Sequence, residues 1–135
     1  MIRRLSVTTI YVLDKDEAID FYVNKLGLEV SADFKQGDYR WVTVRVPGDP
    51  TDISLEQPGS PLHDEATAEQ LRELVTKGAM SALVFHTDDA RALYETLKDR
   101  GVTDFTQEPT DHVYGTDMGI RDPFGNAIRI LQPAT

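Results

Sequence analysis

One histidine has the residue type and the position for acid–base chemistry. His86 lies near the end of the predicted strand Ala79–Thr87, in the second half of the chain. An imidazole with an unperturbed pKa of about 6.5 acts as a base, or donates a hydrogen bond to a ligand carbonyl, near neutral pH. A strand histidine often does no more than hydrogen-bond a neighbour, here beside Asp88. We therefore take His86 as the candidate catalytic residue and leave the purely structural role open.

Two aromatic residues are spaced to bind a flat molecule. Tyr39 and Trp41 alternate along the predicted strand Tyr39–Val46, so both rings project from one face of a sheet. If that face is concave, the rings stack on a ligand, and if it is covered, they belong to the core. Both alternatives stay open on the sequence alone.

The elements that must position these residues occur twice. The interval from Asp14 to Gly27 is 13 positions, and the interval from Asp88 to Gly101 is the same. Each pair brackets a predicted helix, with Asp as the N-cap and Gly as the left-handed stop. The last strands of the two halves also correspond, since ISLEQP (residues 53–58) and IRILQP (residues 128–133) share their ending. Such self-similarity predicts a tandem repeat.

The repeat predicts a single α+β domain over residues 1–135, built from two βαβββ modules. Module one covers about residues 3–58 and module two about residues 79–133, and a linker of about residues 59–78 carries a short helix at Ala66–Val75. Turn residues and β-branched runs set the strand limits. The predicted strands are Leu5–Val12, Leu28–Phe34, Tyr39–Val46, Asp52–Gln57, Ala79–Thr87, Thr103–Glu108, Val113–Arg121 and Ala127–Gln132.

Composition and charge exclude several classes of partner. The formal net charge is −9, from 23 acidic and 14 basic residues, whereas phosphate binding requires clustered Lys and Arg. No apolar stretch approaches the ~20 residues that cross a bilayer, and the first residues lack the apolar run of a signal peptide. The chain has no cysteine, which fits a reducing compartment. We predict a cytoplasmic protein that binds neither nucleic acid nor a membrane.

Two segments resemble the signatures of the vicinal oxygen chelate superfamily, which contains the glyoxalases, the bleomycin-resistance proteins and a group of dioxygenases. The segment from Val12-Leu13-Asp14 through Phe21-Tyr22 to Leu26-Gly27 resembles its opening signature. Asp122-Pro123-Phe124-Gly125-Asn126, preceded by Tyr114-Gly115, resembles its closing signature. The resemblance implies two βαβββ modules whose curved mixed sheets surround a ligand cavity, and often a homodimer. Tyr114 would then lie at a turn where members close over the ligand.

The resemblance also implies where a divalent metal ion would bind in the metal-dependent members. The four strand positions fall on Val7, Ser54, Ala82 (Ser81 if the register shifts by one) and Arg129. None of these residues is a usual ligand, and Arg129 is a fixed cation that would repel the ion. We therefore predict no metal and no other cofactor. The alternative is a displaced divalent ion held by Glu56 and His86.

These observations favour a metal-free protein that binds a small organic molecule, similar to the bacterial bleomycin-resistance-type dimers that confer antibiotic resistance by sequestering a drug. An ion pair between Glu56 and Arg129, in place of the metal, would orient the ligand or simply satisfy itself. The alternative function is a glyoxalase-type lyase, isomerase or dioxygenase that is metal-dependent or assisted by His86. A third reading makes another protein the partner, through the acidic segment Asp64–Glu73. The candidate ligand-binding residues are Tyr39, Trp41, Glu56, His86, Tyr114 and Arg129.

Overall fold

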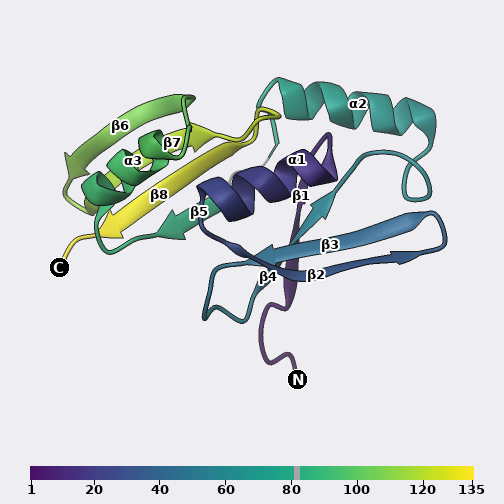
Figure 1. Ribbon diagram of the computed structural model, residues 1–135, viewed down its shortest axis with the longest axis horizontal. Coiled ribbons are helices and arrows are strands. Elements are labelled where there is room, and N and C mark those ends of the chain that lie inside the picture. Colours follow the sequence, from purple (N-terminus) through teal and green to yellow (C-terminus); the bar gives the residue numbers. More distant parts are fainter. Residues whose placement is uncertain (81–82) are drawn as a thin grey trace. The chain divides into compact units, whose positions relative to one another are not determined.

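The chain folds into two compact units, each with the strand–helix–three-strand order predicted from the repeat (Figure 1). The structure is a computed structural model that describes residues 1–80 and 83–135. The units are Met1–Val75 and Thr76–Thr135, so the division falls inside the segment predicted as the linker. Each unit holds a four-stranded mixed sheet, which confirms the α+β fold of two βαβββ modules.

The first unit builds its sheet in the order β1-β4-β3-β2. Strand β1 runs parallel to β4, and the remaining neighbours are antiparallel. A surface helix, α2, follows the sheet where the sequence predicts the short linker helix. The elements are β1 (Val7–Tyr11), α1 (Lys15–Ile19), the π-helical segment η1 (Asp20–Lys25), β2 (Glu29–Gln36), β3 (Tyr39–Arg45), β4 (Asp52–Glu56) and α2 (Glu65–Thr76).

The second unit repeats this arrangement in the order β5-β8-β7-β6, with β5 parallel to β8. Its elements are β5 (Leu83–His86), α3 (Ala90–Asp99), β6 (Phe105–His112), β7 (Gly115–Arg121) and β8 (Ala127–Pro133). Strand β7 begins at Gly115 and not at Val113, because Val113 and Tyr114 form the turn after β6. Ser81 and Ala82, in the strand predicted as Ala79–Thr87, lie outside the described residues.

The residues at which the helices begin differ from the predicted repeat in one detail. Asp14 caps α1 as expected, since its Oδ1 accepts a hydrogen bond from the Glu17 amide at 2.8 Å. The cap of α3 is Asp89 and not Asp88, because the Asp89 carboxylate reaches the amide three residues ahead, that of Ala92, at 3.0 Å. The equal spacing inferred from Asp88 was therefore wrong. Counted from the true caps, the first module carries one residue more before its glycine.

That additional residue is taken up by the π-helical segment η1, Asp20–Lys25. In η1 the amide of Leu26 donates to the carbonyl of Phe21, five residues back, at 3.0 Å. A π turn accommodates one more residue than an α turn without breaking the helix. The two modules therefore keep the same order of elements although their helices differ in length by one position.

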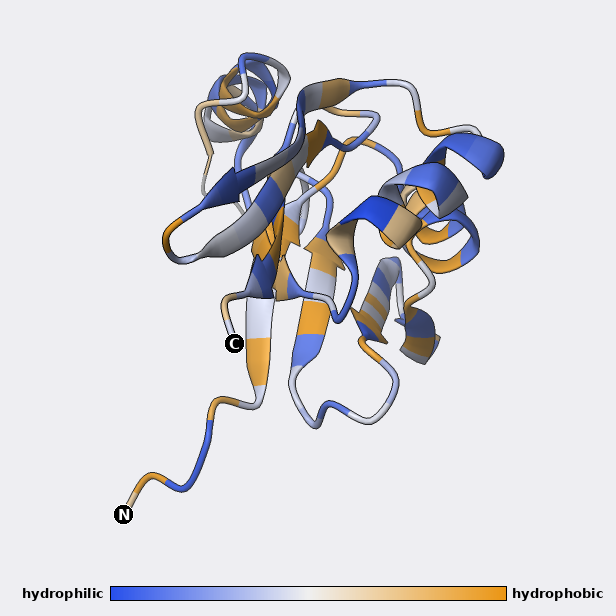
Figure 2. Ribbon diagram, turned by 90° about the vertical axis from the view of Figure 1, so that its left-hand side faces the viewer, coloured by the Kyte–Doolittle hydropathy of each residue, from blue (hydrophilic) through white to orange (hydrophobic). Residues whose placement is uncertain are grey.

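Each sheet buries an apolar face under its helix and presents a polar face on the other side, which we call the distal face. Apolar and polar residues alternate along the strands, as Figure 2 shows, and alternate strand positions point to opposite faces. Under α1 the buried residues include Ile10, Val42, Val44, Ile53 and Leu55, and under α3 they include Met118, Ile120, Ile128 and Ile130. The distal faces carry Tyr39, Trp41, Thr43, Ser54 and Glu56 in the first unit, and Gln107, Asp117, Gly119 and Arg129 in the second. Within the described residues, no helix combines the length and the apolar character that crossing a bilayer requires.

Candidate functional site

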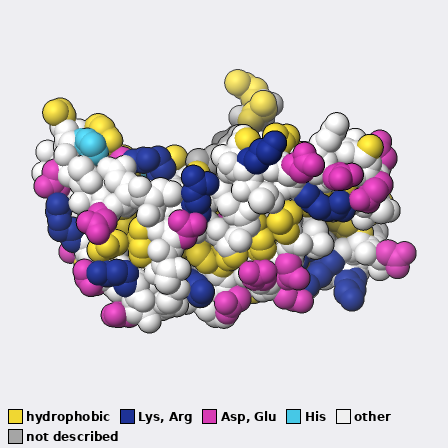
Figure 3. Space-filling view, turned by 90° about the horizontal axis from the view of Figure 1, so that it is seen from above, with side chains coloured by type: hydrophobic (Ala, Val, Ile, Leu, Met, Phe, Trp, Pro, Cys, Tyr) yellow, Lys and Arg dark blue, Asp and Glu magenta, His cyan; other side chains and the backbone are white. Residues whose placement is uncertain are grey.

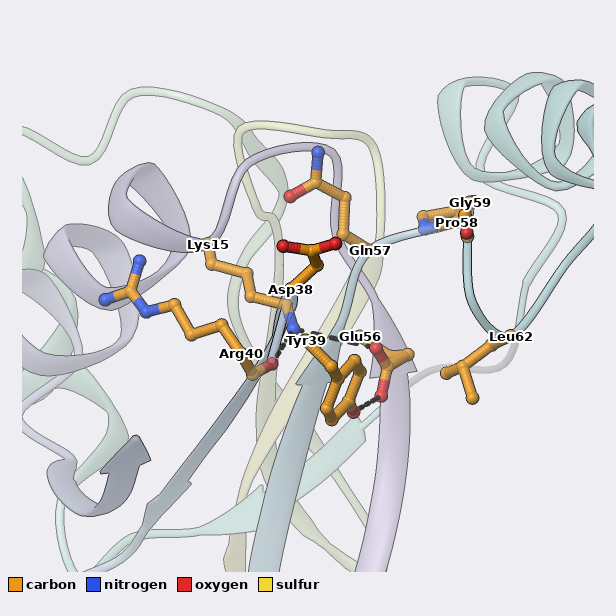
Figure 4. Close-up of a pocket in the computed structure, with 10 residues that line it drawn as sticks. Lys15, Asp38, Tyr39, Arg40, Glu56, Gln57, Pro58, Gly59 and Leu62 are labelled. Atoms are coloured by element: carbon orange, nitrogen blue, oxygen red, sulfur yellow. Dashed lines mark hydrogen bonds and ion pairs between the residues drawn. The ribbon is translucent and has the colours of Figure 1, made fainter. Parts of the chain in front are cut away.

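A cavity of about 370 Å³ lies in the first unit, at the end of the sheet where β3 begins and β4 ends (Figure 4). Its wall is formed by the first turn of α1, the turn between β2 and β3, the start of β3, and the segment from Glu56 to Leu62. The pairing of β4 with β3 brings the start of β3 beside the segment that begins at Glu56. Helix α1, which covers this pairing, adds its first turn. The cavity is therefore a direct product of the module fold.

The polar floor of the cavity is centred on Glu56, which is 6% exposed. The Tyr39 hydroxyl donates to Glu56 Oε2 at 2.6 Å, and the Lys15 Nζ lies 3.6 Å from Glu56 Oε1. Figure 4 shows both interactions as dashed lines. Each carboxylate oxygen is thus engaged by a group from a different element, one from β3 and one from α1.

Lys15 is the site residue that the sequence analysis missed. It is only 9% exposed, its Nζ also donates to the Arg40 carbonyl, and the same atom lies 4.8 Å from the centroid of the Tyr39 ring. A lysine in the first turn of a helix opposes the helix dipole, and lysine is rarely buried without a partner. The available signal was therefore a lysine directly after the capping Asp14, where an acidic residue would be favoured.

Burial raises the pKa of the Tyr39 phenol to about 12, and the hydrogen bond to Glu56 and the charge of that carboxylate add to the effect. The fold thus favours the neutral phenol, because its pKa lies above the ordinary value of 10.0. Because the folded-state pKa is raised, this contribution to stability is complete below pH 10 and is lost as the pH rises through about 12.

The tyrosinate absorbance during an alkaline titration tests this assignment. Subtracting the titration of Tyr39→Phe from that of the wild type isolates Tyr39 among the five tyrosines, and we expect its midpoint at about 12. Glu56→Gln should lower that midpoint without restoring 10.0, because burial of the phenol persists. An unchanged midpoint in Glu56→Gln would contradict a contribution from the carboxylate.

A second polar cluster lies on the distal face of the second unit, around Asp117 of β7. Asp117 is 5% exposed, and its Oδ2 accepts hydrogen bonds from Arg129 NH2 at 2.6 Å and from the Tyr114 hydroxyl at 2.9 Å. The hydrogen bond from Arg129 is the main cause that lowers the pKa of Asp117 below its ordinary range. Arg129 NH2 also donates to Gln107 Oε1 at 3.0 Å, and the His112 ring stacks on Tyr114 with centroids 4.8 Å apart. In this cluster the charge of Arg129 is matched by Asp117, and hydrogen bonds to Asp117 and Gln107 hold the guanidinium in place.

The structure brings some of the predicted site residues together. Tyr39 and Glu56 meet in the cavity, and Trp41 lies further along the same distal face, opposite Phe34 of β2. Inside its own unit each charge has a partner, Glu56 with Lys15 and Arg129 with Asp117. The ion pair between Glu56 and Arg129 joins residues of different units and stays a prediction.

The second unit holds the remaining predicted residues. Tyr114 and Arg129 meet through Asp117. His86 is exposed at the end of β5, opposite Leu131 of β8. Its predicted role, as a catalytic residue or as a partner of Glu56, stays a prediction.

The sequence itself decides the family. The model of the glyoxalase/bleomycin resistance protein/dioxygenase superfamily matches residues 4–130. The chain belongs to this superfamily. Membership confirms the resemblance drawn from the opening and closing signatures.

Several known proteins are similar to this chain over nearly their whole length. YurT of Bacillus subtilis (strain 168), an uncharacterized protein, is 36% identical over 131 residues, which are 96% of this chain and 98% of YurT. The crystal structure of UcmS2 has a TM-score of 0.90 at 41% identity and covers 97% of this chain and 98% of its own. TnmS3, an antibiotic binding protein from Streptomyces sp. CB03234, has a TM-score of 0.78 at 27% identity, with 98% of both chains covered.

The residues at the metal positions implied by the superfamily do not fit a divalent ion. Val7 offers no donor atom, Ser54 offers a hydroxyl, Arg129 is a cation engaged by Asp117, and Ala82 lies outside the described residues. Glu56, the carboxylate on the same strand face as Ser54, has an ammonium group 3.6 Å away. Within residues 1–80 and 83–135, no group of three or more His, Cys, Asp or Glu side chains is arranged to hold a metal ion. The alternative site through Glu56 and His86 stays a prediction, with its two residues in different units.

Proposed function

We propose that this superfamily member binds a small organic molecule, of the antibiotic class, without a metal ion and without breaking a bond in it. The protein would lower the concentration of free ligand by mass action, as a cytoplasmic homodimer. The observation that carries the proposal is the engaged state of Glu56: both of its oxygens already have partners, Lys15 and Tyr39. The antibiotic binding of TnmS3 supports the same class of ligand.

The cavity suits recognition and not chemistry. A volume of about 370 Å³ falls in the range of small-molecule sites. A buried carboxylate that is matched by an ammonium group and a phenol is a poor base and a poor metal ligand, because either role requires those partners to leave. The same groups form a fixed polar floor against which a ligand orients. Trp41 on the same distal face, and Arg129 and Tyr114 in the second unit, are further proposed contacts.

A binding screen tests the proposal directly. Trp41 is the only tryptophan of the chain, so its fluorescence reports binding of an antibiotic collection without labelling. We expect one compound bound per chain and recovered unchanged by mass spectrometry after prolonged incubation. Tyr39→Phe and Glu56→Gln should weaken binding about tenfold each, since a hydrogen bond to a charged group contributes roughly 1.5 kcal/mol or more. Tyr94→Phe, which removes a hydroxyl bonded to Glu108 in the second unit, is the matched control.

Metal content decides between the proposal and its alternative. Protein purified without a histidine tag and soaked in Ni²⁺, Zn²⁺, Mn²⁺ or Fe²⁺ should retain far less than one equivalent per chain, measured by elemental mass spectrometry. One equivalent that is lost in Glu56→Gln or His86→Ala would overturn the metal-free proposal. Turnover of a methylglyoxal–thiol adduct would likewise show the glyoxalase-type enzyme.

A further inference from the structure

Asp38 stands apart from the other charged residues of the cavity because it has no ion-pair partner within the described part of the chain. It lies in the turn between β2 and β3, where its side chain is exposed and lines the cavity. In Figure 4, Asp38 and Gln57 are drawn above the pair formed by Glu56 and Tyr39. Because Asp38 is exposed while Glu56 is buried and Tyr39 is half-buried, the Asp38 carboxylate lies at the rim and the paired groups form the floor.

The two positive charges that line the cavity, Lys15 and Arg40, are already matched. The Lys15 ammonium is held against Glu56. The Arg40 guanidinium binds two carboxylates, Asp16 at 2.8 Å through NH1 and Asp33 at 2.9 Å through NH2. Arg40 donates hydrogen bonds to both carboxylates, Asp33 first, and these raise the pKa of its guanidinium further above its ordinary range. Among the described residues that line the cavity, the charge that remains unmatched is the negative charge of Asp38.

The charge of the whole chain acts in the same direction. The formal net charge is −9, and Figure 3 shows Asp and Glu side chains in groups on the face seen from above. A negative protein raises the local concentration of cations and lowers that of anions. An anionic ligand would meet Asp38 at the rim and find the Lys15 ammonium buried and engaged.

We propose that the cavity selects molecules that carry a protonated amine or amidine, with Asp38 binding the positive group and the Lys15–Glu56–Tyr39 floor binding neutral polar groups. This inference rests on the proposed function and adds the charge class of the ligand. Gln57 and Ser60, which also line the cavity, offer hydrogen-bonding groups of no net charge. Asp38 is thus the residue that sets the sign of the charge on the preferred ligand.

Three probes of one shape test the inference: benzamidine, benzamide and benzoate, which carry positive, zero and negative charge. The measurement is the dissociation constant from chemical-shift changes in ¹H–¹⁵N spectra of the full chain at low salt. We expect benzamidine to bind about fivefold more tightly than benzamide, the size of a partly exposed ion pair, and benzoate to bind most weakly. The shifts should be largest at the amides of Gly37, Asp38 and Gln57. The preference should diminish as the salt concentration rises.

The variant Asp38→Asn should bind benzamidine and benzamide equally. Asp99→Asn, at the exposed end of α3 in the second unit, changes the net charge by the same amount and should keep the preference. Equal loss in both variants, tighter binding of benzoate, or no shift at the cavity amides with benzamidine would each overturn the inference. An antibiotic found in the fluorescence screen that carries no positive charge would also overturn it and leave the proposed function standing.

Discussion

Replacing Lys15 with methionine is expected to destabilise the protein by about 3 kcal/mol, because the change leaves the Glu56 carboxylate buried without its cation. The side chains of Lys15 and Glu56 are 9% and 8% exposed, so water does not compensate for the loss. Methionine keeps most of the volume of the lysine stem. Removing a cation from the first turn of α1 relieves an unfavourable helix-dipole interaction of up to about 1 kcal/mol, which is smaller than the cost. Urea unfolding at neutral pH measures the difference.

The double variant Lys15→Met with Glu56→Gln separates the ion pair from packing. Neither uncompensated charge remains in it, so we expect it to be more stable than the sum of the two single changes predicts, by at least about 1 kcal/mol. Arg45→Met with Glu29→Gln is the matched control, since this pair has a similar N–O distance of 3.2 Å but side chains that are 43% and 48% exposed. The control cycle should give a coupling energy of less than about 1 kcal/mol. Additive changes at Lys15 and Glu56 would contradict a buried, coupled pair.

The parts of the fold that the sequence predicts are those set by short-range rules. Cap residues, left-handed glycines and alternating strands each depend on a few neighbouring positions, and so the βαβββ order was predictable. The cap of α3 was misplaced by one residue because Asp88 and Asp89 carry the same side chain, and which of them adopts the extended cap conformation is decided by the chain around them. Because η1 takes up one additional residue in the first module, counting from Asp88 made the two cap-to-glycine intervals equal, and the misplaced cap did not show in the sequence.

The site was predicted less completely, because partner choice depends on distances between residues far apart in the chain. Tyr39 and Glu56 were recognised from their residue types, and strand alternation placed Tyr39 on one face with Trp41; the hydrogen bond between Tyr39 and Glu56 came only from the structure. The ion pair between Glu56 and Arg129, which joins the two units, stays a prediction. In each unit, a charge on an adjacent element lies within reach and was not predicted as a partner: Lys15 at the start of α1 and Asp117 on β7. The residue types along a sequence do not indicate which of several possible partners a charged side chain binds.

Replacing Asp122 with alanine is expected to be the most damaging change in the second unit, with a loss of about 4 kcal/mol of stability. The residue is 3% exposed and closes the turn between β7 and β8. Its Oδ1 accepts hydrogen bonds from the amides of Phe124, Gly125 and Asn126 at 3.0, 3.0 and 2.9 Å, and its Oδ2 accepts one from Asn126 Nδ2 at 2.8 Å. Alanine leaves these donors without an acceptor where they are buried, at a cost of roughly 1–3 kcal/mol for each that finds no water.

The turn matters to the site because it fixes the register of β7 against β8. That register sets Gly119 opposite Arg129 and lets the arginine reach Asp117, two positions along β7. Asp122→Asn keeps Oδ1 as an acceptor but directs an amide group at Asn126, so an intermediate loss is expected. Adding Asn126→Asp to it restores a donor–acceptor match with the two residue types exchanged, and should recover part of the stability. If alanine and asparagine at position 122 unfold at the same urea concentration, the hydrogen bonds of Oδ1 do not hold the turn. The register of β7 and β8 would then depend on the ladder between the strands.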